Sequence, residues 1–137
     1  YAPMTEEQCK NSALKRAQSD QFWAVCLVAN DKLIGNIYLA EKEFANWEIG
    51  YVFNRSYQNK GYATEAVMLL IENVFAEKQA HRIYAECNPE NVRSWKLLER
   101  LGCEREGHLR KNVYFNRNEE GAPLWQDTFI YGLLKEE

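Results

Sequence analysis

The sequence predicts a single α+β domain with three layers, in which helices cover both faces of a mixed, mostly antiparallel sheet. Three observations lead to this fold class. Apolar runs typical of strands occupy 22–29, 33–40 and 46–54, two helical patterns follow them, and a short strand separates these helices. A strand–helix–strand unit makes a parallel crossover, whereas strands joined by short turns pair antiparallel. Because 137 residues are too few for two ordinary domains, we assign residues 1–137 to one domain.

The front of the chain predicts a short helix. The stretch "TEEQ" at Thr5–Gln8 has the form of a capping box, so a helix from about Glu6 to Gln18 is expected. Its apolar face is thin, so it must pack on another element. After it, Asn30, Asp31 and Lys32 supply the turn between the first two strands.

Two longer helices are better marked. The first opens at Tyr62 and Ala63, and its apolar residues recur at helical spacing: Ala66, Val67, Leu70, Ile71, Val74 and Phe75. For the second, Asn88 is the expected N-cap, Pro89 the first helical residue and Gly102 the stop. The remaining strands are expected at Arg82–Cys87, at Cys103–His108 with an extension towards Phe115, and at Gln126–Leu134.

Composition excludes several classes. The net charge is -3 and the basic residues form no stripe, so neither a nucleic acid nor an acidic membrane is an expected partner. No apolar run approaches the roughly 20 residues that span a bilayer. The four cysteines lack C-x-x-C spacing, which favours reduced, buried thiols in a cytoplasmic protein and argues against a metal site.

The stretch "QNKGYATEA", from Gln58 to Ala66, stands between a strand and a helix. Gly61 tolerates a positive φ, and the N–H groups of a helix N-terminus bind phosphate, beside which Lys60 adds a positive charge. Taken alone, the same residues also suit an ordinary helix cap. The spacing is neither that of a Walker loop nor that of a dinucleotide fingerprint.

In its context, this turn resembles the acetyl-CoA pyrophosphate loop of the GNAT superfamily of N-acetyltransferases. Gln58, Gly61 and Ala63 match the pattern [R/Q]-x-x-G-x-[G/A]. The stretch "NPENVRSWKLLERLGC" is similar to the family's later helix through Asn91 and Ser94. Together with "ATEA" and "EGHLR", it resembles the branch that contains the ribosomal-protein N-terminal acetyltransferases. The resemblance runs from about Gln21 to Leu134.

The sequence also departs from the family pattern. Cys103 stands where an aromatic residue is usual, and Leu98 where many members carry a tyrosine that acts as general acid. Tyr114 and Tyr131 could supply that acid, and nothing in the sequence selects either. The family's first strand would lie before Tyr1.

The resemblance implies that acetyl-CoA is the co-substrate and that the sheet is splayed beside the strand "EIGYVF". On that strand, which carries a bulge in the family, Tyr51, Val52 and Phe53 would pair with pantetheine and bind the acetyl oxygen through main-chain N–H groups. Asn91 would contact the pantetheine amide. The pyrophosphate would bind the loop and first helical turn: Gln58, Asn59, Lys60, Gly61, Tyr62, Ala63 and Thr64.

Two side chains are candidates for catalysis. Glu48 lies in an otherwise apolar strand, where desolvation would make it a useful general base, and its position resembles that of the family's base. Ser94 would donate to the leaving thiolate. The alternatives stay open: Glu48 could face solvent on an alternating strand, and Ser94 could belong to a helix cap.

The expected function is acetyl transfer from acetyl-CoA to a primary amine, either on a protein N-terminus, which the branch favours, or on a small amine such as a polyamine, an amino sugar or a metabolite. The alternative is a non-catalytic acyl-CoA-binding domain on the same scaffold, and a third hypothesis is a nucleotide-binding domain of another fold. The edge of the last two strands offers a surface for a homodimer. His81 and His108 receive no role.

Overall fold

The computed structural model describes residues 6–8, 12–16, 21–57 and 61–135. Its contacts group into two compact units, Tyr1–Ile83 with Leu134–Glu137, and Tyr84–Leu133. The elements of the chain, in order, are β1 (Glu6–Gln8), β2 (Ser12–Arg16), β3 (Phe22–Leu27), β4 (Leu33–Glu41), β5 (Asn46–Phe53), α1 (Tyr62–Glu77), β6 (Arg82–Cys87), α2 (Val92–Arg100), β7 (Glu104–Val113) and β8 (Gln126–Leu134).

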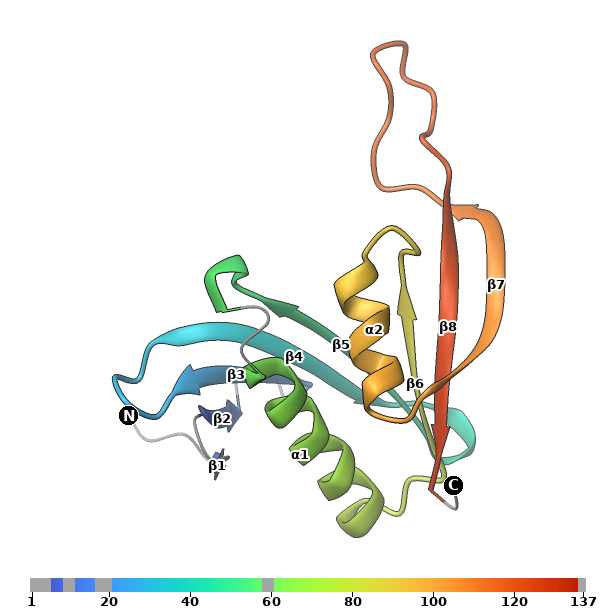
Figure 1. Ribbon diagram of the computed structural model, residues 1–137. Helices are drawn as coiled ribbons and strands as arrows, with labels where there is room; N and C mark the ends of the chain where they lie inside the picture. Colours follow the sequence, from blue (N-terminus) through green and yellow to red (C-terminus); the bar gives the residue numbers. More distant parts are fainter. Residues whose placement is uncertain (1–5, 9–11, 17–20, 58–60, 136–137) are drawn as a thin grey trace. The chain divides into compact units, whose positions relative to one another are not determined.

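The first unit is built on the antiparallel order β1-β2-β3-β4-β5 (Figure 1). Side chains opposite one another share a face, so Trp23, Ile37 and Ile49 lie together in the core. Helix α1 packs on β2. It does so through the predicted apolar stripe, of which Ala66, Val67, Leu70, Ile71 and Val74 are buried.

The predicted helix from Glu6 to Gln18 is wrong. Strands β1 and β2 occupy this stretch instead, and β2 pairs with β3 from Ser12↔Leu27 to Arg16↔Trp23. Leu14 becomes fully buried in this position. The helical signal was local and its apolar face thin, so pairing with a strong neighbouring strand outweighs it. Thr5 and Cys9 lie outside the described residues.

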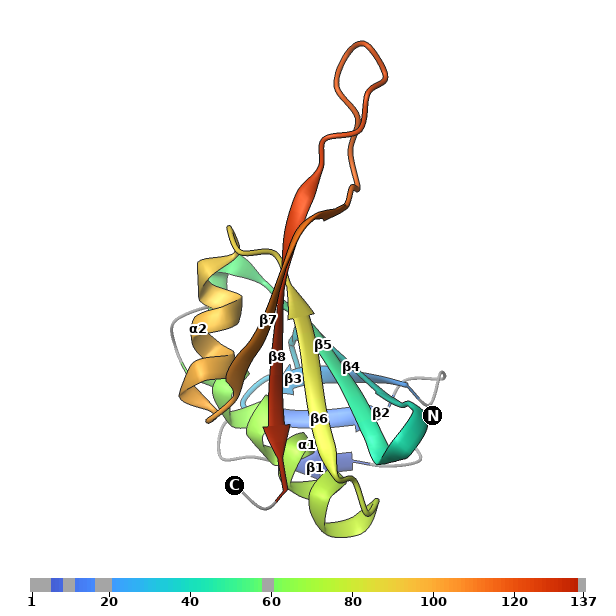
Figure 2. The ribbon, with the colours of Figure 1, turned by 90° about the vertical axis from the view of Figure 1, so that its right-hand side faces the viewer.

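The second unit carries α2 and the strand order β6-β8-β7. Helix α2 packs beside β7, and the chain between β7 and β8 projects beyond these strands (Figure 2). The predicted bounds of β6 and β8 are confirmed, and α2 ends as expected at Gly102, whose φ is +95°.

The predicted start of α2 is wrong. Asn91, not Asn88, is the N-cap. Asn88 instead closes a turn, since its Oδ1 accepts from the main-chain N–H of Glu90 at 2.9 Å. The main-chain N–H of Asn91 also donates to the carbonyl of Asn88 at 2.9 Å, so residues 88–91 form a turn and the helix begins after it.

Candidate functional site

The predicted phosphate-binding turn is described from Gly61 onward; Gln58, Asn59 and Lys60 lie outside the described residues. Gly61 precedes α1 with φ +81°, a left-handed conformation that favours glycine. A Cβ atom added there would meet nothing within 4 Å. The glycine is therefore required by the backbone conformation and not by crowding.

The N-terminus of α1 presents main-chain donors. Its first intrahelical hydrogen bond runs from the N–H of Glu65 to the carbonyl of Gly61 at 3.0 Å. The N–H groups of Tyr62, Ala63 and Thr64 precede that bond, and among the described residues no side chain caps the helix. Such a turn suits an anionic group such as a pyrophosphate.

Strand β5 holds the next group of predicted residues. Its ladder with β4 runs without a register shift from Trp47 to Phe53, so the expected bulge is not present in this pairing. Tyr51 and Phe53 belong to the core face, with ring centroids 6.3 Å apart. Val52 lies on the opposite face and is 74% exposed. The strand thus combines a packed face with an open one.

Glu48 shares the open face of β5 with Val52, because side chains two residues apart on a strand point the same way. Its side chain is 25% exposed, so it is half-buried. Its Oε1 atom lies 3.6 Å from the Nζ atom of Lys42. The structure therefore places a partly desolvated carboxylate three residues before Tyr51 on the same strand.

Asn91 and Ser94 lie in the second unit and are brought together at the start of α2. The Oδ1 atom of Asn91 accepts from the main-chain N–H of Ser94 at 3.4 Å. Both belong to the first turn of the helix, so the capping role that sequence reasoning left open for them is confirmed for Asn91.

Comparison with known proteins decides the family. The pattern of the Acetyltransferase (GNAT) domain matches residues 2–104. This chain belongs to the GNAT acetyltransferase family. It is 39% identical over 138 residues to the uncharacterized N-acetyltransferase YnaD of Bacillus subtilis, covering 97% of this chain and 76% of that protein.

Two further matches support the assignment. A crystal structure of a GNAT-family acetyltransferase from Bacillus anthracis superposes with a TM-score of 0.83 at 27% identity, covering 97% of this chain and 100% of that chain. This match confirms the predicted fold class. The [ribosomal protein uS5]-alanine N-acetyltransferase of Escherichia coli is 39% identical over 85 residues, covering 62% of this chain and 41% of that enzyme. Members of the family use acetyl-CoA as the acetyl donor, so the chain is an acetyl-CoA-dependent N-acetyltransferase.

The second unit of this acetyltransferase contains a polar cluster that sequence reasoning missed. The guanidinium carbon of Arg105 lies 3.7 Å from the ring centroid of Phe129, and Arg105 Nε donates to the hydroxyl of Tyr131 at 3.0 Å. That hydroxyl donates to Glu99 at 2.6 Å. Burial, followed by the hydrogen bond to Glu99, raises the pKa of Tyr131. Because its ring is fully buried and its hydroxyl is bonded twice, nothing marks Tyr131 as the general acid.

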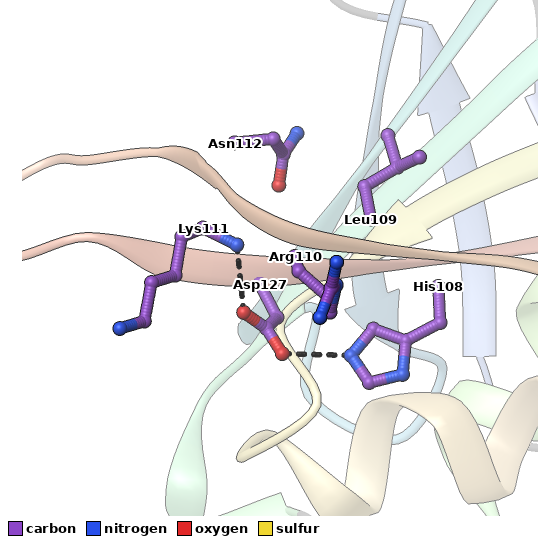
Figure 3. Close-up of a pocket in the computed structure, with 6 residues that line it drawn as sticks. All are labelled: His108, Leu109, Arg110, Lys111, Asn112 and Asp127. Atoms are coloured by element: carbon purple, nitrogen blue, oxygen red, sulfur yellow. Dashed lines mark hydrogen bonds and ion pairs between the residues drawn. The ribbon is translucent and has the colours of Figure 1, made fainter.

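A shallow pocket at the root of the β7–β8 hairpin is the second missed feature (Figure 3). His108 Nε2 lies 2.7 Å from Asp127 Oδ2, and the main-chain N–H of Lys111 donates to Asp127 Oδ1 at 2.8 Å. These two hydrogen bonds lower the pKa of Asp127. Lys111 has a φ of +46°, so Asp127 fixes the irregular part of β7.

The described cysteines fit the predicted buried thiols in part. Cys26 and Cys103 are buried and Cys87 is half-buried, and these three described cysteines form no disulfide. Burial raises the pKa of both Cys87 and Cys103 to about 11. Within the described ranges, no group of three or more His, Cys, Asp or Glu residues could hold a metal ion. In the same part of the chain, none of the helices is long and apolar enough to cross a membrane.

Proposed function

We propose that this acetyltransferase acetylates a primary amine by direct attack of the amine on the thioester, with Glu48 as the general base. The observation that carries the proposal is the half-buried Glu48 carboxylate on the open face of β5, beside the strand segment that sequence reasoning assigns to acetyl-CoA. A partly buried carboxylate is costly unless a partner or a function accounts for it, and its ion pair with Lys42 is long at 3.6 Å.

The acetyl donor would bind two parts of the first unit. Its pyrophosphate would accept hydrogen bonds from the N–H groups of Tyr62, Ala63 and Thr64, and from the loop residues before Gly61. Its pantetheine would run along Tyr51, Val52 and Phe53, where a main-chain N–H would polarise the thioester carbonyl. The exposed side chain of Val52 leaves that face of the strand open to a ligand.

In the reaction, Glu48 would take a proton from the acceptor ammonium, directly or through a water molecule. The neutral amine then attacks the thioester carbon and forms the new C–N bond. As the C–S bond breaks, the excess proton on the nitrogen passes to the departing thiolate, so the products are the amide and the thiol of CoA. Ser94 would donate a hydrogen bond to that thiolate, and Asn91, while capping α2, would contact the pantetheine amide.

The acceptor that we favour is a protein N-terminus. The support is the similarity to an enzyme named for the alanine of ribosomal protein uS5. An α-amino group has a pKa near 8, so a substantial fraction is already neutral at physiological pH and a carboxylate base can complete the deprotonation. Small amines remain the alternative acceptors within the same chemistry.

The test is Glu48→Gln, which keeps the shape of the side chain and removes its basicity. We expect kcat to fall by about 10²- to 10⁴-fold, the range for general-base catalysis, while the Kd of acetyl-CoA stays unchanged. The matched control is Glu41→Gln, an exposed carboxylate at the end of β4 that should leave kcat unchanged.

An unchanged kcat in Glu48→Gln, or a loss confined to acetyl-CoA binding, would remove Glu48 from the mechanism. In the same assay, Ser94→Ala should lower kcat without changing the Kd of acetyl-CoA. Acetyl-CoA binding without turnover of any amine in a panel of peptides and polyamines would instead support the non-catalytic acyl-CoA-binding alternative.

A further inference from the structure

The register of β4 and β5 places Lys42 next to Glu48, the proposed base. Glu41 pairs with Trp47, and the main-chain N–H of Lys42 donates to the carbonyl of Asn46 at 2.8 Å. Lys42 is therefore opposite Asn46 and diagonal to Glu48 on the same face, a spacing that long side chains can bridge. Its Nζ atom lies 3.6 Å from Glu48 Oε1.

The backbone that carries Lys42 is firmly held. In the turn Glu43–Ala45, Phe44 and Ala45 both have left-handed φ values, +61° and +58°. Asn46 fixes this turn through a hydrogen bond of 2.9 Å from its Nδ2 to the carbonyl of Glu43. A further bond of 2.9 Å runs from the N–H of His81 to the carbonyl of Ala45. Strained residues persist only where their surroundings hold them in this way.

The side chain of Lys42, in contrast, is partly open to solvent. It is 42% exposed, and its distance to Glu48 exceeds the 2.7–2.9 Å of a charge-assisted hydrogen bond. Partly exposed ion pairs of this kind contribute little net free energy. An incoming ammonium group can therefore replace Lys42 as the partner of Glu48 at small cost.

We propose that Lys42 is a positioning residue for the reaction: it pairs with Glu48 in the free enzyme and is displaced by the ammonium group of the acceptor. This inference depends on the proposed function, because it takes Glu48 as the base. It goes further in naming the cation that occupies Glu48 before the acceptor binds and in predicting selection for positively charged acceptors.

Several other groups lie near the ion pair of Lys42 and Glu48. Ala40 stands opposite Glu48, and Tyr38 stands opposite Gly50, the next residue on this face. Asn46 lies two residues before Glu48, and Arg82 donates to its Oδ1 atom at 3.0 Å. Glu43 lies in the turn. Among the charged groups near Glu48, Lys42 is the one for which an ion pair with Glu48 is observed.

The experiment compares Lys42→Met, which keeps the length and removes the charge, with Lys42→Arg, which keeps the charge. In Lys42→Met, KM for the acceptor should fall, because a competing cation is gone, while kcat stays within about twofold of wild type. Lys42→Arg should keep the wild-type KM for the acceptor.

The control is Lys78→Met, an exposed lysine at the end of α1 that carries the same charge change. Melting temperature and the Kd of acetyl-CoA are measured for every variant, to exclude a folding defect. If Glu48→Gln loses kcat but Lys42→Met keeps the wild-type KM for the acceptor, the role of Lys42 is wrong and the proposed function stands. An equal fall in KM in Lys78→Met would also overturn the role of Lys42. If Glu48→Gln keeps its kcat, the proposed function fails and this inference fails with it.

Discussion

The two units of the molecule differ in how they use polar groups. In the first unit, the N–H groups at the start of α1 have no capping side chain among the described residues, and Glu48 has one weak ionic partner at 3.6 Å. In the second unit, polar groups are bonded to one another, as in Arg105–Tyr131–Glu99 and His108–Asp127. Groups left open suit a ligand, whereas groups bonded within the fold stabilise it.

This difference gives a criterion for separating residues of the site from residues that stabilise the fold. Removing an open polar group should lower activity at constant stability, because the folded state loses no partner. Removing a group of the Arg105–Tyr131–Glu99 or His108–Asp127 cluster should lower stability at constant activity. The substitutions below test whether this division holds.

The largest expected effect on stability concerns Gly35 in the first unit, and Gly132 in the second unit serves as its control. A Cβ atom on Gly35 would lie 2.5 Å from a ring carbon of Phe53 and 2.8 Å from the carbonyl oxygen of Val52. Because a backbone atom cannot move aside cheaply, Gly35→Ala should lower the free energy of unfolding by about 1–3 kcal/mol, measured by urea denaturation.

Gly132→Ala is the matched control from the second unit. Its added Cβ atom would meet only the carboxylate end of Glu106, the flexible tip of a long side chain. We expect a change close to zero. If both variants lost the same free energy of unfolding, the close approach of the Val52 carbonyl oxygen to Gly35 would not be the cause of the loss in Gly35→Ala.

The second effect concerns the hydroxyl of Tyr131. Tyr131→Phe removes the group that joins Arg105 and Glu99, and we expect a loss of about 1 kcal/mol in the free energy of unfolding at pH 7.5. Glu99 and Arg105 are partly exposed, so water can solvate the groups that lose this partner. The kcat should stay at the wild-type value. A large loss of kcat with unchanged stability would instead identify Tyr131 as the missing general acid.

The pH dependence of this variant gives a second readout. Because the folded state raises the pKa of Tyr131, its hydroxyl contributes stability below about pH 10, the ordinary value, and this contribution is lost as pH rises through the folded-state pKa. The difference in free energy of unfolding between wild type and Tyr131→Phe should therefore shrink above pH 10. Cys87 and Cys103 titrate in both proteins and cancel from the difference. A constant difference would mean that packing, and not the hydroxyl, decides the effect.

Local signals explain which elements could be predicted from sequence. Strand β6 lies between clear helical patterns, and Gly102 marks the end of α2, so both were located correctly. The stretch at Ser12–Arg16 was not, because its structure depends on pairing with β3, a partner that no capping pattern reveals. An N-cap at Asn88 was wrong because residues 88–91 form a turn before the helix, and Asn91 caps it instead.

The site follows the same rule. Glu48 and Gly61 were found from motifs in consecutive residues, and their roles stay predictions. Lys42 was missed because its relation to Glu48 depends on the register across the turn. Alternation on the two strands was visible in the sequence, so counting outward from the turn would have placed them diagonally. Arg105 could not be found, since its partner Tyr131 is 26 residues away in sequence on another strand.

The smallest expected effect concerns Asp127, which holds the irregular part of β7. Its pKa is lowered in the folded state, so its ionised form contributes stability above the ordinary value near pH 3.9, and this contribution is lost as pH falls through the lower folded-state pKa. Asp127→Asn should thus be slightly less stable than wild type at pH 7. The difference should narrow as pH falls below the ordinary value, measured by urea denaturation across that range.

Glu119→Gln, at an exposed position of the hairpin, is the control and should show no difference at any pH. Two outcomes separate the contributions at Asp127. A difference that narrows in acid shows that the charge of the carboxylate stabilises the root of the hairpin through His108. A difference that stays constant below the ordinary pKa would show that the charge does not carry the effect, since an ionisation-dependent contribution must shrink once the unfolded-state carboxylate is protonated.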